Sequence, residues 1–197
     1  MLAAVLVALG CAARLDGQRA RDADRFDPTF RKYTKRFFGP AFDWRHFKAQ
    51  GLAESGLDTA ARSRNGAQGI MQLMPNTLAA IRSHARDLDS VVDPELNIAA
   101  GIKHDRALWV MWPQAATIED QRCFMFASYN AGLITIQRAS RVARRRRLDP
   151  TQWQSIVQVS ALVYRWRQRQ TLHYLRVLEG WFDQLDERGR LVRRQPS

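Results

Sequence analysis

Residues 54–75, ESGLDTAARSRNGAQGIMQLMP, place one carboxylic acid at the end of a predicted helix and follow it with a glycine-rich segment. The helix is expected from about Asp43 to Ser55. Phe47, Gly51 and Glu54 recur at helical spacing, so Glu54 shares a face with a core phenylalanine. A carboxylate there is costly unless it is partnered or used, and Gly51 leaves space for it. Glu54 is either a catalytic acid or an exposed residue at a frayed helix end, and this pattern alone favours the second interpretation.

The rest of the chain predicts mostly α-helix. Asn65-Gly66 and the neighbouring glycines indicate an irregular or short β-hairpin segment after the acid-bearing helix, over residues 56–70. Runs with helical periodicity follow, and no alternating β-branched run of useful length interrupts them. Helices are expected at residues 76–85, 95–112, 118–129 and 133–143, with aromatic helix-packing residues between 152 and 185.

Composition indicates a folded chain with an anionic partner. An apolar content of 46% and six tryptophans exclude disorder throughout, and 197 residues suffice for one domain with a hydrophobic core. The net charge of +12 fits nucleic acid, a membrane surface or an acidic cell-wall polymer. The strongest charge run, Arg144–Arg147, precedes Leu148-Asp149-Pro150 and is expected in a loop, either as a solvated segment or as a contact with a polyanion.

Cysteine and histidine positions show no pattern of a disulfide framework or a metal site. Cys11 and Cys123 are the only cysteines, and the four histidines share no ligand spacing with one another or with a cysteine. The chain also has no phosphate-binding glycine loop and no nucleophile elbow. We therefore expect no cofactor and no metal.

The N-terminus resembles a secretory signal. The apolar run from Leu2 to Leu9 is too short to span a bilayer and is followed by small residues. Leu9-Gly10-Cys11 also resembles the end of a bacterial lipobox. We expect export, with residues 1–13 as a signal peptide or lipoprotein signal, and two fates stay open: a lipid anchor at Cys11, or cleavage after Ala12 or Ala13.

Composition also divides the remaining chain. Residues 14–36 alternate Arg and Asp and predict a polar tether, with room for one docking helix from Pro28 to Phe37. Gly39-Pro40 marks a boundary. The folded domain is expected over residues 37–186, and residues 187–197 predict a basic, frayed tail.

Motifs in a fixed order resemble the soluble-lytic-transglycosylase (SLT) catalytic domain. They are Glu54-Ser55, Ser63, Gly66-Ala67-Gln68-Gly69-Ile70-Met71-Gln72-Leu73-Met74-Pro75, Asp93-Pro94 with Asn97 and Gly101, and Ser128-Tyr129-Asn130-Ala131-Gly132. The resemblance covers roughly residues 42–180. It implies a single lysozyme-like domain of the goose-type/SLT kind, acting on bacterial peptidoglycan. Asp43-Trp44 and the arginine-rich stretch are most similar to the membrane-bound lytic murein transglycosylase F branch, while Ala53 stands where the family usually has Gln.

The resemblance implies that Glu54 serves as general acid and then base. Glycoside cleavage commonly uses two carboxyl groups, whereas this family uses one and lets the sugar's own N-acetyl and 6-hydroxyl groups supply the rest. Glu54 would protonate the oxygen between N-acetylmuramic acid and N-acetylglucosamine and then deprotonate the 6-hydroxyl, giving a 1,6-anhydromuramic end. That role requires a protonated acid near neutral pH, which burial favours. The resemblance also implies six substrate-binding residues: Ser63, Gln72, Met74, Tyr129, Asn130 and Tyr174.

The implied partner is the glycan strand of peptidoglycan. We expect a periplasmic monomer, membrane-anchored if Cys11 is lipidated, and no binding of nucleic acid. Two alternatives stay open: a goose-type lysozyme-like hydrolase, and a non-catalytic module whose basic surface holds the cell wall.

Overall fold

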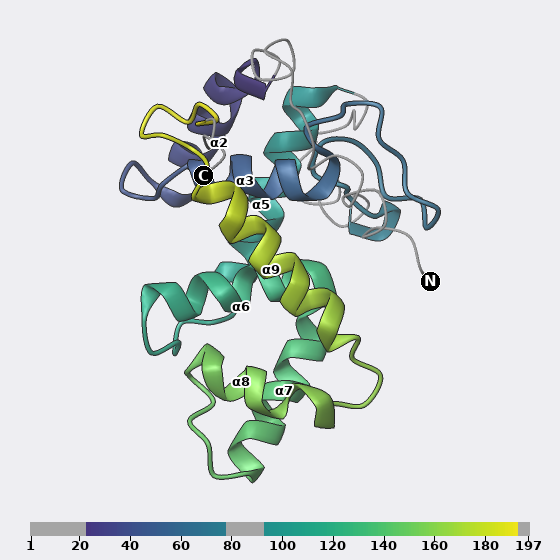
Figure 1. Cartoon of the computed structure of the whole chain (residues 1–197), viewed down its shortest axis with the longest axis vertical. Helices are drawn as coiled ribbons and strands as arrows, with labels where there is room; N and C mark the ends of the chain where they lie inside the picture. Colours follow the sequence, from purple (N-terminus) through teal and green to yellow (C-terminus); the bar gives the residue numbers. More distant parts are fainter. Residues whose placement is uncertain (1–22, 78–92, 193–197) are drawn as a thin grey trace, which may run out of the picture. The chain divides into compact units, whose positions relative to one another are not determined.

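The structure, a computed structural model, describes residues 23–77 and 93–192. These ranges are mostly helical, with isolated β-bridges in place of strands (Figure 1). The mostly α prediction is therefore confirmed. The helices are α2 Asp27–Phe38, α3 Arg45–Ser55, α5 Pro94–Trp109, α6 Ile118–Ala131, α7 Leu133–Arg145, α8 Trp153–Val159, the 3-10 helix η2 Ser160–Leu162, and α9 Gln168–Phe182.

Contacts between residues group the chain into two compact units. Of the described residues, unit 1 comprises 23–77, 93–103 and 177–192, and unit 2 comprises 104–176. Helices α5 and α9 each contribute residues to both units, whereas the sequence predicts a single domain. The predicted signal segment with Cys11, and most of the helix predicted at residues 76–85, lie outside the described residues.

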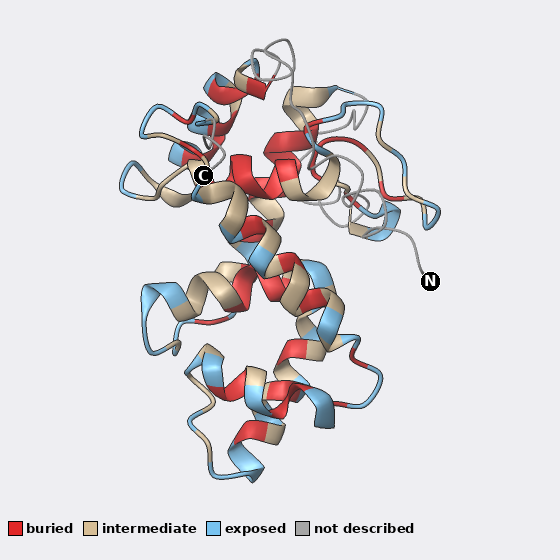
Figure 2. Ribbon diagram, viewed as in Figure 1, coloured by how far each residue is buried: buried red, intermediate tan, exposed pale blue. Residues whose placement is uncertain are grey.

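Helix α3 is the buried centre of unit 1. All its residues from His46 to Leu52 are buried, so over these two turns the helix is enclosed rather than amphipathic (Figure 2). A Cβ added at Gly51 would lie 2.8 Å from the side chain of Leu57 and 3.2 Å from those of Ile70 and Phe30. The expectation that Gly51 leaves space for the acid is wrong, because three apolar side chains use that space.

Helix α2 packs into unit 1 and corrects the prediction of a polar tether. Pro28 stands in its first turn, where a missing N–H breaks no helical hydrogen bond. Phe30 and Tyr33 are buried, and burying two aromatic rings is worth several kcal/mol, about 1.5–3 for each side chain. The docking helix is present, and the tether predicted for residues 14–36 is wrong for the part described from residue 23 onward.

A buried cation, Lys48, joins three segments of unit 1. Its side chain has no solvent exposure, and its Nζ lies 2.6 Å from Oδ1 of Asp27 and 2.8 Å from Oδ1 of Asp24. Nζ also donates a hydrogen bond of 2.8 Å to the carbonyl oxygen of Gly189. Burial raises the pKa of Asp27 to about 6, although the neighbouring ammonium group opposes that rise. One ammonium group thus holds the N-terminal helix, α3 and the end of the chain together.

The chain after α9 also packs against unit 1. Leu185 and Leu191 form an antiparallel bridge. Gly189 has a φ of +86°, and a side chain there would overlap the indole of Trp44. The frayed tail predicted for residues 187–197 is therefore wrong for its described part.

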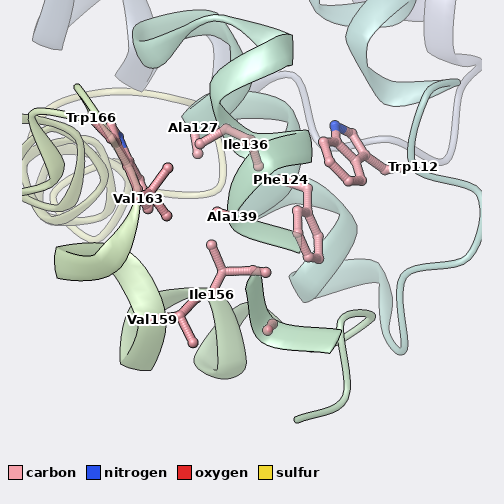
Figure 3. Packing of buried hydrophobic residues seen from close by; sticks show 10 residues of the cluster. Trp112, Phe124, Ala127, Ile136, Ala139, Ile156, Val159, Val163 and Trp166 are labelled. Atoms are coloured by element: carbon pink, nitrogen blue, oxygen red, sulfur yellow. The ribbon is translucent and has the colours of Figure 1, made fainter. Parts of the chain in front are cut away.

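Unit 2 has its own hydrophobic core between α6, α7 and α8. Phe124, Ile136 and Ile156 come from these three helices and are all buried (Figure 3). The indole of Trp112 stacks on Phe124 with ring centroids 4.6 Å apart, and its Nε1 donates to Oγ of Ser128 at 3.1 Å. The indole is therefore both packed and hydrogen-bonded, as buried tryptophans require.

Helix α7 continues into the arginine run that the sequence assigns to a loop. Its apolar positions, including Ile136 and Ala143, are buried, and the helical pattern carries Arg144 and Arg145 into the last turn. Cations in that turn interact favourably with the negative end of the helix dipole. The loop prediction is wrong for these two arginines and holds from Arg146 onward.

Removing the buried cation should destabilise the protein strongly. We expect Lys48→Met to lower the free energy of unfolding by about 3 kcal/mol, because two carboxylates lose their buried partner. Urea unfolding followed by circular dichroism measures the change. Lys32→Met is the matched control: its pair with Glu95 is solvent-exposed, so the unfolding midpoint should scarcely move. Equal effects of the two substitutions would contradict the role of Lys48.

The raised pKa of Asp27 predicts a pH dependence of stability. A carboxyl with a folded-state pKa of about 6 and an ordinary value of 3.8 binds its proton more tightly in the folded protein. Its contribution to the free energy of unfolding is therefore fully present below 3.8 and is lost as the pH rises through about 6. Asp27→Asn should remove this slope in unfolding curves measured across that window. Asp24→Asn, which removes the other carboxylate at Lys48, should keep it.

Candidate active site

Glu54 stands at the end of α3, and backbone geometry fixes that end. Gly56 adopts a left-handed conformation with φ of +66°, and its N–H donates to the carbonyl oxygen of Leu52 at 3.0 Å. The N–H of Leu57 donates to the carbonyl oxygen of Gly51 at 3.3 Å. The first is the 5→1 hydrogen bond of an αL cap, and the second adds a further hydrogen bond that closes the helix end. Glu54 is half-buried, so the frayed, solvated helix end is not what the structure shows.

The segment after α3 is irregular and has short β contacts, as predicted. Gln68 forms antiparallel bridges with both Arg62 and Leu73. Ser63 closes the intervening turn: its N–H donates to the carbonyl oxygen of Ala67 at 2.9 Å, and its Oγ accepts from the N–H of Ala67 at 3.0 Å. Ser63 therefore shapes the loop directly.

A side chain next to Glu54 fastens this loop to α3. The hydroxyl of Ser55 donates to the carbonyl oxygen of Ile70 at 2.9 Å. Gln72 has a φ of +44° and turns its side chain back over the loop, where Nε2 donates to the carbonyl oxygens of Gly69 at 2.9 Å and Ala61 at 3.2 Å. Hydrogen bonds thus hold Ser55, the residue after Glu54, to the backbone of the loop.

Asn97 of α5 is a site-shaping residue to which the sequence assigns no role. Its Oδ1 accepts from the N–H of Met71 at 2.8 Å, and its Nδ2 donates to the carbonyl oxygen of Gln68 at 3.1 Å. The side chain is buried. Gly69, with φ of +75°, admits this amide, since a Cβ there would overlap it. An asparagine among the apolar positions of a predicted helix was the available signal, because buried amides need partners.

Met71 and Met74 have different environments. Met71 is fully buried and packs on Gly101, where an added Cβ would lie 2.7 Å from its Cγ. Met74, at the end of the loop, is 42% exposed. Of these two methionines, Met74 is the one that the structure leaves accessible to a ligand.

The six predicted substrate-binding residues fall into two sets, one in each unit. Ser63, Gln72 and Met74 belong to unit 1 with Glu54, and the other three belong to unit 2. Of these three, Tyr129 is half-buried, Asn130 is exposed in the last turn of α6, and Tyr174 is buried in α9. Two helices thus carry these three residues, α6 the first two and α9 the third.

His104 is a second residue that the sequence reasoning missed. Its ring lies against Tyr129 with centroids 5.3 Å apart. Burial lowers the pKa of His104, because desolvation disfavours the charged imidazolium. The imidazole beside Tyr129 is therefore held in its neutral form at neutral pH.

Asp58, the carboxylate nearest to Glu54 in sequence, has a local structural role. It is exposed, and its Oδ1 accepts from the N–H of Ala60 at 2.8 Å. This is the pattern of an Asx turn. The described residues contain no cluster of three His, Cys, Asp or Glu side chains suited to a metal ion. Among those residues, no helix is both long and apolar enough to cross a membrane.

The fold and the site define a lysozyme-like helical protein. The structure is similar to that of the 70 kDa soluble lytic transglycosylase of Escherichia coli, with a TM-score of 0.56 and 20% sequence identity over 79% of this chain and 23% of that one. The model of the transglycosylase SLT domain matches residues 39–150, more than half of the sequence. The chain belongs to this family, as its motifs predicted.

Its relatives include proteins named membrane-bound lytic murein transglycosylase F. The one from Desulfosudis oleivorans is 32% identical over 71% of this chain and 29% of its own length. The one from Shewanella frigidimarina is 26% identical over 84% of this chain and 36% of its own length. The chain thus spans about a third of the length of these relatives.

The close approach of Gly69 to Asn97 predicts a specific loss on substitution. Gly69→Ala should lower the free energy of unfolding by about 2 kcal/mol more than Gly56→Ala, because only the first adds a steric overlap. Both glycines have positive φ, +75° and +66°, but a Cβ at Gly56 would meet nothing within 4 Å. The matched control therefore isolates the overlap from the backbone strain common to both. Urea denaturation of the two variants measures the difference, and equal losses would contradict it.

Proposed function

We propose that the chain is a peptidoglycan lytic transglycosylase. It cleaves the β-1,4 bond between N-acetylmuramic acid and N-acetylglucosamine without water and leaves 1,6-anhydromuramic ends. The observation that carries the proposal is the family match over residues 39–150, which contains the acid-bearing end of α3 and its fastened loop.

Glu54 is the proposed general acid and base. It is half-buried at a helix end that hydrogen bonds close, and the neighbouring Ser55 ties this end to the loop. Such rigidity supports catalysis because proton transfer depends on a fixed position relative to the glycosidic oxygen. The same carboxylate then takes the proton from the 6-hydroxyl as that oxygen closes the anhydro ring. No second carboxylate is needed in this scheme, and the turn-forming role of Asp58 agrees with it.

Three of the six proposed substrate contacts, Ser63, Gln72 and Met74, belong to unit 1. In unit 1, Gln72 uses its amide nitrogen within the loop, so its amide oxygen is the atom proposed to receive a donor from the sugar. Met74 offers an exposed apolar contact at the end of the loop. Ser63 is proposed to act chiefly by shaping the turn.

In unit 2, Tyr129, Asn130 and Tyr174 are the proposed contacts. Asn130 is exposed and Tyr129 lies beside a neutral imidazole. Neutral hydrogen-bonding groups suit an uncharged sugar, because they bind it without the desolvation cost of an ion.

We further propose that the chain is exported and acts in the periplasm, as the peptidoglycan substrate requires. The N-terminal apolar run supports export, and Leu9-Gly10-Cys11 supports a lipid anchor at Cys11. The names of the relatives, which describe them as membrane-bound, agree with an anchor.

Digestion of purified sacculi followed by mass spectrometry of the fragments tests the activity. Fragments should end in anhydromuramic acid, lighter by one water than hydrolytic products. Reducing muramic ends would contradict the proposal and indicate a hydrolase. Sacculus binding without cleavage would indicate a wall-binding module.

Glu54→Gln should lower the rate of sacculus digestion at least about 100-fold, because it removes the transferable proton. Binding to sacculi should persist, since the amide keeps the shape of the side chain. Asp58→Asn is the matched control, a carboxylate removed four residues away, and should keep most of the activity. A Glu54→Gln variant as active as Asp58→Asn would exclude Glu54 as the acid.

A further inference from the structure

Unit 2 carries most of the positive charge of the protein. Residues 104–176 contain twelve arginines and four carboxylates, a net charge of +8 out of the total +12. Two of these carboxylates already accept hydrogen bonds from backbone N–H groups: Asp120 from Trp153 at 2.7 Å, and Asp149 from Thr151 at 2.9 Å. A surface of this kind attracts anionic partners over a distance of about one Debye length, roughly 10 Å.

One part of unit 2 combines this charge with exposed apolar groups. The segment that we call the connecting loop is residues 162–169, LVYRWRQR, and it runs from the last residue of η2, Leu162, into the first turn of α9, which contains Arg169. Two of its side chains, Val163 and Trp166, are buried in the core of unit 2, where Figure 3 labels them. Trp166 Nε1 also donates to Oγ1 of Thr171 at 3.0 Å. The connecting loop is therefore anchored at two points.

Large apolar side chains next to these anchors are held in solvent. Leu162 is 53% exposed and Tyr164 is 73% exposed. Arg165 follows with a φ of +58°, a conformation that costs about 1–2 kcal/mol for a residue with a side chain. Its guanidinium lies 5.1 Å from the centroid of the Tyr164 ring. Strained backbone that holds an aromatic ring and a cation outward together needs an explanation beyond packing.

We propose that the connecting loop is a docking surface for anionic phospholipid headgroups. Leu162 and Tyr164 enter the boundary between headgroups and acyl chains, where an amphipathic ring and an aliphatic side chain are both favourable. The exposed side chains of Arg165 and Arg169 lie at the level of the lipid phosphates. The contact is peripheral, and the remaining charge of unit 2 draws the protein to the surface.

The combination of groups favours lipid over other anionic partners. Nucleic acid and the acidic groups of the cell wall would match the arginines, but neither rewards an exposed leucine. Two other surfaces of unit 2 carry either exposed apolar side chains or exposed arginines, but not both kinds together. Val110 and Met111 are exposed apolar neighbours without an adjacent arginine in sequence, and Arg144 and Arg145 are exposed cations on a helix end. These surfaces supply matched controls.

Sedimentation with vesicles tests the proposal on the full chain. The vesicles are phosphatidylcholine alone or with about one third phosphatidylglycerol, which supplies the negative surface potential. Leu162→Ser/Tyr164→Ser and Arg165→Gln/Arg169→Gln should each weaken binding to the anionic vesicles at least about tenfold. The N-terminal segment is the same in every variant and cannot produce the difference.

The matched controls separate binding by this surface from nonspecific apolar contact and from the effect of net charge. Val110→Ser/Met111→Ser removes an equal number of exposed apolar side chains, and Arg144→Gln/Arg145→Gln removes an equal charge. Both should weaken binding less than about threefold, the part due to long-range attraction. Thermal unfolding by circular dichroism should show all four variants folded, because every substituted side chain is exposed.

Three results would overturn the proposal. Controls that weaken vesicle binding as much as the loop variants would show that the loop is not a specific surface. Loop variants that bind vesicles as well as the wild type would exclude it from membrane contact. Loop variants that lose binding to purified sacculi but keep vesicle binding would assign the loop to the cell wall.

Discussion

The amide of Asn97 is the interaction on which the arrangement around Glu54 depends. It accepts from the N–H of Met71, a fully buried residue, and adds a hydrogen bond to the carbonyl oxygen of Gln68, which also accepts from the N–H of Leu73 at 3.1 Å. A buried backbone group without a partner costs about 1–3 kcal/mol. The short bridges of this loop pair Gln68 with Arg62 and Leu73 and do not include Met71, for whose N–H a side chain from α5 supplies the acceptor. Gly69 follows from the same constraint, since only a residue without Cβ lets the amide approach.

The sequence predicted the elements that local pattern determines. Helical periodicity located α3, α5, α6 and α7 to within a few residues, and Asn65-Gly66 indicated the irregular segment. It failed where contacts distant in sequence decide the outcome. Residues around Phe30 and Gly189 have the composition of a tether and a tail. In the folded chain, however, Phe30 packs at Gly51 and Gly189 packs against Trp44, which are distant from them in sequence. Composition describes a segment in isolation and carries no information about the surface that covers it.

The candidate site shows the same division. The motif order predicted that Glu54 and the loop form a site, because a family resemblance carries long-range information that periodicity lacks. The physical reasons inferred for individual residues were less successful. Gly51 admits apolar side chains rather than the acid, and Ser63 and Gln72 spend hydrogen bonds on the loop itself. Asn97 was quoted among the motif residues without a role and His104 was not singled out, since the role of each rests on a partner in another segment.

The buried ammonium group of Lys48 shows why the family match and the folded unit have different limits. The matched region, residues 39–150, contains α3 but not Asp24, Asp27 or Gly189. Without those partners, the ammonium group of Lys48 would be a buried and unpaired charge, which costs several kcal/mol of stability. The flanking segments are therefore part of the condition for burying α3. Two sets of contacts hold different parts of α3. Hydrogen bonds within the matched region fix the end that carries Glu54, and the ion cluster of Lys48, which reaches outside that region, fixes the middle. The helix that carries Glu54 is consequently specified by more sequence than the family motifs cover.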